Sequence, residues 1–481
     1  MRFRVMATRS IVNIGVAGLL LSAAPIGLGA YAQLAGSAAG KRLSDVPADP
    51  YPSTYAPRPS VLTAIVGATA YTGTGATVAN ATVVMDGGKI VSIGEGAPAP
   101  AGAVVIDGKG KFVTPGLIDA HSHLGVGPSP SLAAVEGTNE ATDPNTAEVW
   151  AEHSVWPQDP QFARALAGGV TSMQILPGSA NLFGGRSVIL KNVWSRSVQG
   201  MKFPGAKYGL KMACGENPMR VYGEKNRTPA TRMANFAGYR AGWVKALEYQ
   251  YEWDQFNAKR AQGDPAAKPP KRDLELDTLA AALRGDILVQ MHCYRADEMM
   301  QVLDMAEEFG YRVTQFHHAV EAYKVRDVLA RKNICGSMWS DWWGFKMESL
   351  DGIEENIALM HDAGACAVVH SDSAVGIQRL NLDAAKSLAA GRRIGLNISD
   401  GEAIKWITLN PAKSLALDDR VGSLEAGKMA DVVVWSGNPL SVYSHAEKVY
   451  IDGALTYDYD DPARQYRSDF ETGYMDKENV R

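Results

Sequence analysis

The sequence GLIDAHSHLG, residues 116–125, is an apolar, strand-like run that ends on two histidines separated by one serine. In a β-strand, residues i and i+2 point to the same face, so His121 and His123 are expected side by side, roughly 6–7 Å apart along the backbone. Two neighbouring imidazoles in apolar surroundings are costly unless their lone pairs are satisfied, and a divalent metal ion does this well. The alternative is a pair of polar residues beside a solvated loop, and this stretch alone does not decide between the two.

The middle of the chain, residues 114–418, alternates strand-like apolar runs with helical patterns. The candidate strands are GLIDAHSH, GVTSMQIL, YGLKMACG, DILVQMHC, YRVTQFHH, NICGSM and ACAVVHSD. Repeated βα units over roughly 300 residues predict a parallel α/β fold, most simply a (β/α)8 TIM barrel. Residues 220–275 depart from this pattern with a charged helical stretch and the breaker-rich GDPAAKPPKRD, which predicts an insertion on the barrel rim.

Short strands and tight turns occupy residues 61–113 and return at residues 419–460. The pairs Asp86-Gly87 and Asp107-Gly108 are hairpin signals between β-rich runs. These two pieces flank the predicted barrel, so the sequence predicts one small β-sandwich built from both chain ends. Residues 461–481 are expected as a C-terminal tail.

The N-terminus has the features of an export signal. Three arginines precede an apolar stretch, and AYA at residues 30–32 gives a small-residue cleavage pattern, so residues 1–32 are predicted as a signal peptide. The alternative is an uncleaved membrane anchor of about 20 residues. Residues 33–60 are expected as a flexible linker, and no later run is long and apolar enough to span a bilayer. A periplasmic or secreted protein is therefore predicted.

The composition of the chain indicates which classes of binding partner to expect. Lys and Arg total 48 against 52 for Asp and Glu, which gives no electrostatic reason to expect binding to nucleic acid or to a membrane surface. We expect a small-molecule substrate and allow for a homo-oligomer. Cys214, Cys293, Cys335 and Cys366 lie in or beside apolar runs without the spacing of a disulfide framework, so they are predicted as buried thiols.

Further histidines also stand at the ends of predicted strands. ILVQMHC carries His292, VTQFHH ends on His317 and His318, and CAVVHSD ends with His370 and Asp372. In a TIM barrel the chemistry sits at the C-terminal ends of the strands. Six of the nine histidines occupy four such ends, and clustered neutral imidazoles with a carboxylate match a zinc-type site.

These motifs together resemble the amidohydrolase superfamily over roughly residues 60–460. VTPGLIDAHSHLG is similar to the opening signature of that superfamily, and GSLEAGKMADVVVWSGNPL is similar to its closing one. Within the superfamily, GVTSMQILPGSANLFGG and HCYRADEM resemble the imidazolonepropionase-related branch. The resemblance implies a barrel that holds a divalent metal, most simply zinc, with one or two ions per chain.

The resemblance also implies a set of ligands. His121 and His123 resemble the metal ligands of the first strand, and His292 matches the ligand of the fifth. On the sixth strand, HHAVEAY aligns best with His318 as the ligand, which leaves His317 where the family often has an acidic residue. Asp372 matches the aspartate of the eighth strand.

The remaining family ligand is a glutamate or a carboxylated lysine, and YGLKMACGENP supplies both candidates. Glu216 stands at the end of the strand, before a turn that contains proline, and is preferred. Lys211 lies earlier in the strand between apolar residues and could carry a carbamate that bridges two metal ions. A buried lysine otherwise needs a partner or a shifted pKa.

The activity that this resemblance implies is metal-dependent hydrolysis of a C–N bond in a cyclic amide or a dipeptide-like substrate. A metal lowers the pKa of a bound water toward 7, and Asp372 would accept the proton of this attacking water. His370 is expected either to hydrogen-bond a ligand or to be structural.

Several further residues are candidates for substrate contact. Tyr294 and Arg295 follow His292 directly, and Arg295 either grips a substrate carboxylate or pairs with Asp297. Arg186 is a weaker candidate. Trp339, Trp342 and Trp343 stand on a loop that is expected over the barrel mouth and either line the pocket or pack the loop.

Two other functions stay open from the sequence. The same metal-activated water could hydrolyse an ester or a lactone. A non-catalytic, metal-bound scaffold could instead use the insertion and the tryptophans to bind a partner, although such a scaffold needs no general base at Asp372.

Overall fold

The computed structural model describes residues 49–131, 133–342 and 344–465. The predicted signal peptide, residues 1–32, lies outside the described residues. Most of the predicted linker and most of the predicted tail also lie outside them. All helices and strands named below belong to one compact unit that begins at Tyr51.

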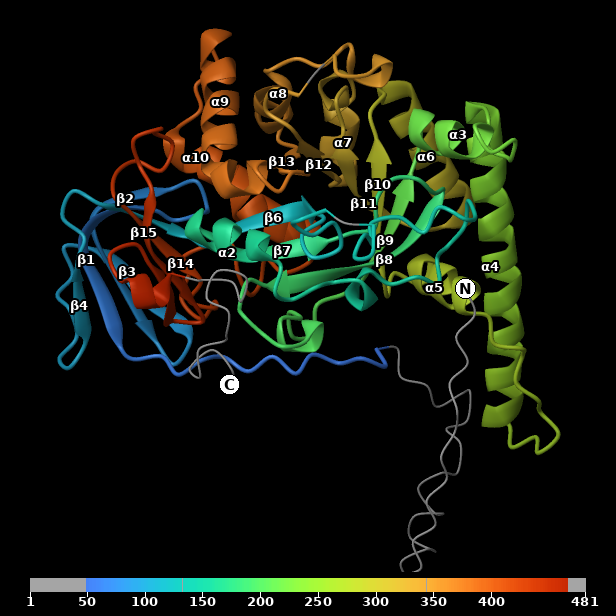
Figure 1. Ribbon diagram of the computed structural model, residues 1–481, viewed down its shortest axis with the longest axis horizontal. Helices are drawn as coiled ribbons and strands as arrows, with labels where there is room; N and C mark the ends of the chain where they lie inside the picture. Colours follow the sequence, from blue (N-terminus) through green and yellow to red (C-terminus); the bar gives the residue numbers. More distant parts are fainter. Residues whose placement is uncertain (1–48, 132, 343, 466–481) are drawn as a thin grey trace, which may run out of the picture. The chain divides into compact units, whose positions relative to one another are not determined.

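One eight-stranded sheet forms the barrel, in the order β13-β12-β11-β10-β9-β8-β7-β6 (Figure 1). Its strands are β6 (Leu117–Ser122), β7 (Val170–Ile175), β8 (Phe183–Lys191), β9 (Gly209–Ala213), β10 (Leu288–Cys293), β11 (Val313–His318), β12 (Cys335–Met338) and β13 (Cys366–Val369). The backbone N–H of Asp372, just after β13, donates to the carbonyl of His121 in β6 at 3.1 Å, so the two edges of the sheet meet. The predicted barrel is confirmed.

One strand of the barrel differs from the expected parallel arrangement. Strand β8 runs antiparallel to both β7 and β9. The link from β7 to β8, residues 176–182, is shorter than the dozen or so residues that a parallel crossover needs, so β8 returns as a hairpin. The seven strands predicted from the sequence correspond to the other seven, which run parallel.

Helices cover the barrel strands, which explains why β6 to β10 are buried along their whole length. The helices are α2 (Pro160–Ala167), α3 (Glu216–Gly223), α4 (Arg232–Ala261), α5 (Leu274–Leu283), α6 (Ala296–Phe309), α7 (Arg326–Lys332), α8 (Asn356–Asp362), α9 (Leu380–Arg393), α10 (Asp400–Ile404) and α11 (Leu409–Ser414). Capping side chains explain where some of these helices begin. The side chain of Asp159 caps α2 ahead of Pro160, and Ser399 with Glu402 forms a capping box on α10.

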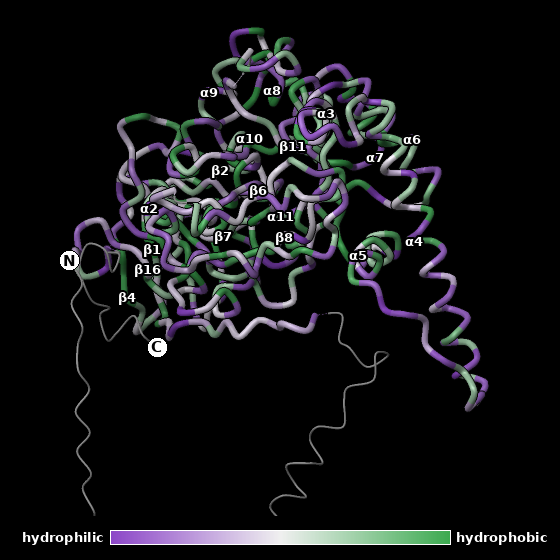
Figure 2. Tube along the Cα trace, turned by 45° about the vertical axis from the view of Figure 1, so that its right-hand side comes forward, coloured by the Kyte–Doolittle hydropathy of each residue, from purple (hydrophilic) through white to green (hydrophobic). Residues whose placement is uncertain are grey.

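The predicted insertion contains helix α4, which is 30 residues long. Thr231 caps its start, and Tyr239, Trp243 and Ala246 bury one face of its first half. Figures 1 and 2 both show the C-terminal half of α4 projecting past the barrel. The insertion therefore adds an arm to the side of the barrel between β9 and β10.

A second eight-stranded sheet combines both chain ends, in the order β16-β15-β14-β5-β1-β2-β3, with β4 also paired to β1. Its strands are β1 (Thr63–Tyr71), β2 (Thr77–Asp86), β3 (Lys89–Glu95), β4 (Val104–Asp107), β5 (Phe112–Pro115), β14 (Val432–Trp435), β15 (Ala446–Ile451) and β16 (Ala454–Asp458). Ile65, Val83, Met85 and Val432 belong to a hydrophobic core of its own. This sheet is the sandwich domain that the sequence predicts.

The described end of the predicted linker is held in place. The side chain of Lys202 donates to the carbonyl of Tyr51 at 2.7 Å, and the backbone N–H of Thr54 donates to the carbonyl of Gln199 at 2.9 Å. The hydroxyl of Tyr55 donates to the carboxylate of Asp452 in the sandwich domain. These hydrogen bonds fix the described end of the linker against residues 199–202 and against the sandwich domain.

The four cysteines form two disulfides, Cys214–Cys293 and Cys335–Cys366, so the prediction of buried free thiols is wrong. Cys335 and Cys366 are register partners in β12 and β13, and their Cα atoms lie 4.4 Å apart. Cys214 follows β9 and faces the last residue of β10, with a Cα–Cα distance of 5.2 Å. Strand register brings these pairs together, and linear spacing does not reveal it. Among the described residues, no helix combines the length and the apolarity that crossing a membrane requires.

Candidate metal centre

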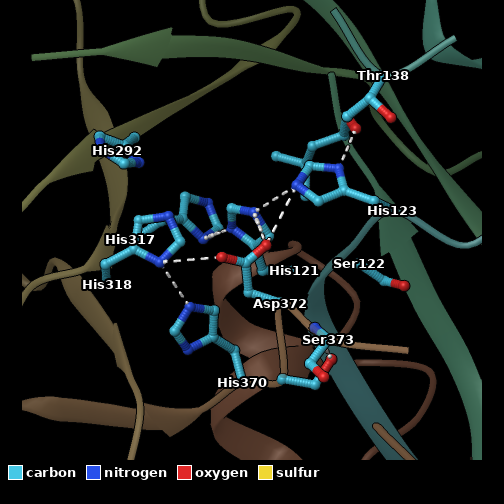
Figure 3. Close-up of polar contacts among 12 residues, drawn as sticks. His121, Ser122, His123, Thr138, His292, His317, His318, His370, Asp372 and Ser373 are labelled. Carbon is cyan, nitrogen blue, oxygen red and sulfur yellow. Dashed lines mark hydrogen bonds and ion pairs between the residues drawn. The ribbon is translucent and has the colours of Figure 1, made fainter. Parts of the chain in front are cut away.

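The histidines predicted at strand ends come together at the C-terminal mouth of the barrel (Figure 3). His121 belongs to β6, His317 and His318 end β11, and His370 and Asp372 follow β13. His318 and Asp372 have positive φ angles of 67° and 48°, a conformation that costs energy for residues with a Cβ atom. Strained backbone of this kind is enriched at active sites and ligand clamps.

One group of ligand atoms comes from β6 and from the loop after β13. The Nε2 atoms of His121 and His123 lie 3.3 Å apart. The Oδ1 atom of Asp372 lies 3.4 Å from the first and 3.2 Å from the second. The pair of histidines predicted in the opening motif and the predicted aspartate therefore face a common point.

A second group joins the first. His318 Nδ1 lies 3.0 Å from His370 Nε2 and 3.8 Å from Asp372 Oδ2. One ligand atom from each of His121, His318 and His370 lies within 4.8 Å of the others. His370, which the sequence left between a supporting and a structural role, thus lies within the cluster. We call His121, His123, His318, His370 and Asp372 the metal centre.

Hydrogen bonds outside the metal centre fix its rings. His123 Nδ1 lies 2.8 Å from the carbonyl of Leu176, an acceptor, so Nδ1 carries a proton and Nε2 is the ring nitrogen that faces Asp372. His317 lies between Gln290 Oε1, 2.7 Å from its Nε2, and His121 Nδ1, 2.9 Å from its own Nδ1. His317, which stands where the family often has an acidic residue, therefore orients the ring of His121.

Asp119 is a supporting residue that the sequence reasoning missed. Its carboxylate accepts from the backbone N–H of His121 at 3.1 Å and from that of Ser371 at 3.2 Å, and the hydroxyl of Ser371 also donates to it. Asp119 thereby ties the end of β6 to the loop that carries Asp372. The signal was an aspartate inside a buried apolar strand, which is rare unless its oxygens are satisfied.

Burial sets the protonation of the histidines. Desolvation holds the pKa values of His121, His292, His317 and His318 well below the ordinary value, and it lowers the pKa of His370 to about 4. These rings are neutral at pH 7 and keep lone pairs for a ligand. Burial alone would raise the pKa of Asp372, but the hydrogen bond and charge of His123, with His370 and Lys211, lower it below the usual value.

His292 lies beside the metal centre without joining its converging atoms. Its ring centroid is 4.5 Å from that of His318, and its Nε2 is 3.5 Å from the side-chain nitrogen of Asn217. Its buried Nδ1 has no hydrogen-bond partner among the described residues. The structure thus places this predicted ligand next to the site with one ring nitrogen unsatisfied.

The two candidates for the remaining ligand lie in different surroundings. Lys211 is fully buried inside the barrel, its ammonium donates to the carbonyl of Pro177 at 3.1 Å, and burial lowers its pKa to about 8. Glu216, the preferred residue, begins α3 and lies 3.4 Å from the ammonium of Lys346. The side chain of Glu216 is 30% exposed and is not among the converging ligand atoms.

Of the side chains predicted to contact the substrate, only some lie beside the metal centre. Tyr294 packs edge-on against His318, with ring centroids 5.3 Å apart. Arg295 pairs with Asp297 at 2.9 Å, which is the second of its two predicted alternatives. Arg186 in β8 donates to Thr278 of α5 at 2.8 Å and stacks on Trp150, so its side chain packs β8 against these neighbours. Trp343 lies outside the described residues.

The metal centre has the chemistry of a site for a divalent cation. Imidazole nitrogens and one carboxylate oxygen converge, and among the described residues the buried Nδ1 atoms of His292 and His370 have no hydrogen-bond partner. Packing such atoms together is costly unless a cation or protons neutralise them. The cluster of Cys214, Cys293 and Glu298 is different, because its two sulfur atoms are already joined in a disulfide.

The sequence model of the amidohydrolase family matches residues 112–458 of this chain. The chain belongs to the amidohydrolase family. It is 33% identical over 401 residues to the amidohydrolase tasK of Hapsidospora irregularis, covering 79% of this chain and 40% of that protein. This chain therefore spans less than half the length of that relative.

Other relatives match over most of their length. The imidazolonepropionase of Streptococcus pyogenes serotype M3 is 24% identical over 451 residues, covering 80% of this chain and 93% of that protein. Among solved structures, an amidohydrolase from Thermotoga maritima MSB8 has a TM-score of 0.74 and 36% identity, covering 82% of this chain and all of that one. The predicted superfamily and the enzyme class are confirmed: this amidohydrolase is a hydrolase acting on C–N bonds. The imidazolonepropionase-related branch stays a prediction.

Proposed function

We propose that this amidohydrolase is an exported enzyme that uses a divalent cation, zinc by its donor set, to hydrolyse a cyclic amide or a dipeptide-like substrate. The observation that carries the proposal is the convergence of His121 Nε2, His123 Nε2 and Asp372 Oδ1 within 3.4 Å of one another. Imidazole nitrogens and a carboxylate oxygen are a ligand set that zinc prefers. The signal-like pattern of residues 1–32 and the two disulfides support a periplasmic or secreted location.

The residues in and around the metal centre have different roles in the proposed reaction. When bound, a divalent cation at this centre supplies a water of lowered pKa and polarises the carbonyl of the substrate. Asp372, held as a carboxylate by its lowered pKa, accepts the proton of the attacking water and then delivers it to the leaving nitrogen. His317 and Asp119 hold His121 and the Asp372 loop in place through the hydrogen bonds described above.

Lys211 is better placed than Glu216 to complete the ligand set. A pKa of about 8 leaves part of Lys211 as a neutral amine near pH 7–8, and a neutral amine reacts with carbon dioxide to form a carbamate. The ammonium also lies close enough to shift the pKa values of His121, His292, His317 and His318. Glu216 instead pairs with Lys346. We therefore favour a carboxylated Lys211 and two cations per chain.

Elemental analysis of the purified mature protein tests this ligand set. We expect two metal ions per chain in the wild type and in a Glu216→Gln variant, and the loss of at least one in Lys211→Ala. A single ion that persists in Lys211→Ala but disappears in Glu216→Gln would restore the original preference for Glu216.

The substitution Asp372→Asn tests the chemistry. Loss of a general base is expected to lower kcat/KM by about 10²–10⁴-fold, measured on a panel of cyclic amides and dipeptides with matched esters. Elemental analysis of the same variant must still find metal for this result to concern proton transfer. Unchanged turnover would overturn the role of Asp372, and turnover of the esters alone would overturn the proposed substrates.

A further inference from the structure

Four aromatic side chains extend from the metal centre to the surface of the barrel mouth. Trp339 stacks on His318 with ring centroids 4.4 Å apart and on His370 at 5.2 Å. Trp342 stacks in turn on Trp339 at 5.1 Å. Phe345 packs edge-on against both tryptophans, at 5.7 Å and 6.3 Å, and Tyr294 packs edge-on against Trp339. We call Tyr294, Trp339, Trp342 and Phe345 the aromatic ladder.

Exposure increases along the aromatic ladder from the metal centre outward. Tyr294 and Trp339 are 4% and 8% exposed, whereas Trp342 and Phe345 are 44% and 55% exposed. Met347 and Leu350, on the same loop, are 77% and 61% exposed. Exposed apolar side chains gathered beside a functional site usually mark a binding surface, since leaving them in water gains nothing for folding.

The loop that carries the aromatic ladder is anchored at both sides of the mouth. Asp341 pairs with Lys386 of α9 at 2.8 Å, and Lys346 donates to Asn217 of α3 at 3.1 Å. The indole N–H of Trp339 donates to the carbonyl of Ser371, next to Asp372, at 3.2 Å. The inner tryptophan is therefore fixed against the loop that holds the proposed general base.

The cations around the aromatic ladder already have acidic partners. Lys346 lies 3.4 Å from Glu216 and 3.7 Å from Glu348, and its ammonium sits 4.0 Å above the ring of Tyr294. Arg295 pairs with Asp297, and Lys386 pairs with Asp341 and Asp383. A negatively charged substrate group at this place would compete with these carboxylates, so the surroundings favour an uncharged group.

We propose that the aromatic ladder binds an uncharged aromatic or bulky apolar group of the substrate, next to the C–N bond that is cleaved. This inference rests on the proposed function and specifies its substrate class. Planar rings gain from stacking on Trp342 in addition to the apolar area that they bury. The expected substrates are amides that carry such a group close to the carbonyl, in preference to small or anionic ones.

Binding of hydroxamates, which chelate divalent metal ions, tests the aromatic ladder without turnover. Isothermal titration calorimetry of the zinc-loaded mature protein compares acetohydroxamate, phenylacetohydroxamate and 4-carboxyphenylacetohydroxamate. We expect the phenyl compound to bind about ten-fold or more tightly than acetohydroxamate, because burying and stacking one ring gives at least this factor. The carboxylated compound is expected to lose most of that gain.

Variants separate the aromatic ladder from the metal centre. In Trp342→Ala with Phe345→Ala, the preference for the phenyl compound is expected to fall to about two-fold or less, while the affinity for acetohydroxamate is unchanged. Trp342→Phe keeps a ring and should retain most of the preference. Tyr443→Ala, at a side chain that is 92% exposed on the loop between β14 and β15, is the control and should change neither affinity.

Each contrary outcome has a distinct meaning. Equal affinity of the wild type for the three hydroxamates, or a preference that survives in the double variant, overturns this inference and leaves the metal centre intact. Failure of all three to bind overturns the proposed function as well. A double variant that changes its mass by light scattering but keeps the ligand preference shows that the ladder is a contact between copies of the chain, which also overturns the inference.

Discussion

Two buried clusters of ionisable side chains in this molecule differ in how their charges are matched. Where the sandwich meets the barrel, the ammonium of Lys191 lies 3.0 Å from Asp431 Oδ1 and 3.0 Å from Asp452 Oδ1. The backbone N–H of Asp452 donates to Asp431, and the hydroxyl of Tyr55 donates to Asp452. We call Lys191, Asp431, Asp452 and Tyr55 the Lys191 cluster. Its donors and acceptors satisfy one another.

The metal centre is less completely buried, because the side chains of His123 and Asp372 are 24% and 22% exposed, and it lacks a cationic side chain between its acceptor atoms. Imidazole nitrogens and a carboxylate oxygen approach one another at 3.0–3.4 Å, and several of the rings are held neutral by burial. A cluster that is complete in itself holds domains together, because each group already has its partner. A cluster of converging lone pairs instead binds an external cation. Composition alone does not distinguish the two, and the pairing of atoms does.

The largest difference is expected when one member of each cluster is removed. His121→Ala should weaken zinc binding by about 10²–10³-fold, since the roughly 10–16 kcal/mol of a structural zinc site is shared among about four ligands. Competition with a chromogenic chelator measures this affinity. The unfolding midpoint of the metal-free variant should stay close to that of the metal-free wild type, and a fall comparable to that of Lys191→Ala would contradict the distinction.

Lys191→Ala should have the opposite profile. Removing one partner of a buried ion pair leaves unpaired carboxylates and costs about 3–5 kcal/mol in the free energy of unfolding, measured by denaturant titration. Zinc affinity should not change. Lys428→Ala is the matched control, because Lys428 pairs with Glu425, which is 57% exposed, and such surface pairs contribute about 1 kcal/mol or less. Equal losses in the two variants would remove the structural role of the Lys191 cluster.

The two disulfides sharpen the comparison further. Cys335→Ala with Cys366→Ala opens the β12–β13 link and should cost about 2–4 kcal/mol of stability without changing zinc affinity. Cys214→Ala with Cys293→Ala should cost a similar amount. It should also weaken zinc binding through His292, the predicted ligand beside the metal centre, because Cys293 follows His292 directly and the N–H of Cys214 donates to the carbonyl of His292 at 2.9 Å. Identical zinc affinities in the two double variants would show that His292 does not depend on its neighbouring disulfide.

Much of this arrangement could be predicted from the sequence, and the failures have physical reasons. The seven parallel strands carry apolar runs, four of which have a histidine at or just after their end, whereas β8 contains Gly184, Gly185 and Arg186 and looks like a loop. His121, His123 and Asp372 were identified because their spacing or strand-end position is visible along the chain. The disulfides and the pairing of Glu216 with Lys346 depend on register and on loop conformation, which linear spacing does not contain.

The smallest effect that distinguishes the clusters is a dependence of stability on pH. Burial lowers the pKa of His370 to about 4, against about 6.5 in the unfolded chain. Between pH 4 and 6.5 the unfolded state therefore binds more protons than the folded state, so stability rises with pH by up to about 1.4 kcal/mol per pH unit for this one group.

Denaturant unfolding of the metal-free protein at pH 4.5, 5.5 and 6.5 measures this slope. His370→Gln should show a shallower slope than the wild type, because it removes one group that is neutral when folded and charged when unfolded at the lower pH. Lys191→Ala should lower stability while leaving the contribution of His370 in place. If His370→Gln and the wild type lose stability in parallel as the pH falls, His370 is not held neutral, and the metal centre is then less like a ready cation site than its converging nitrogens indicate.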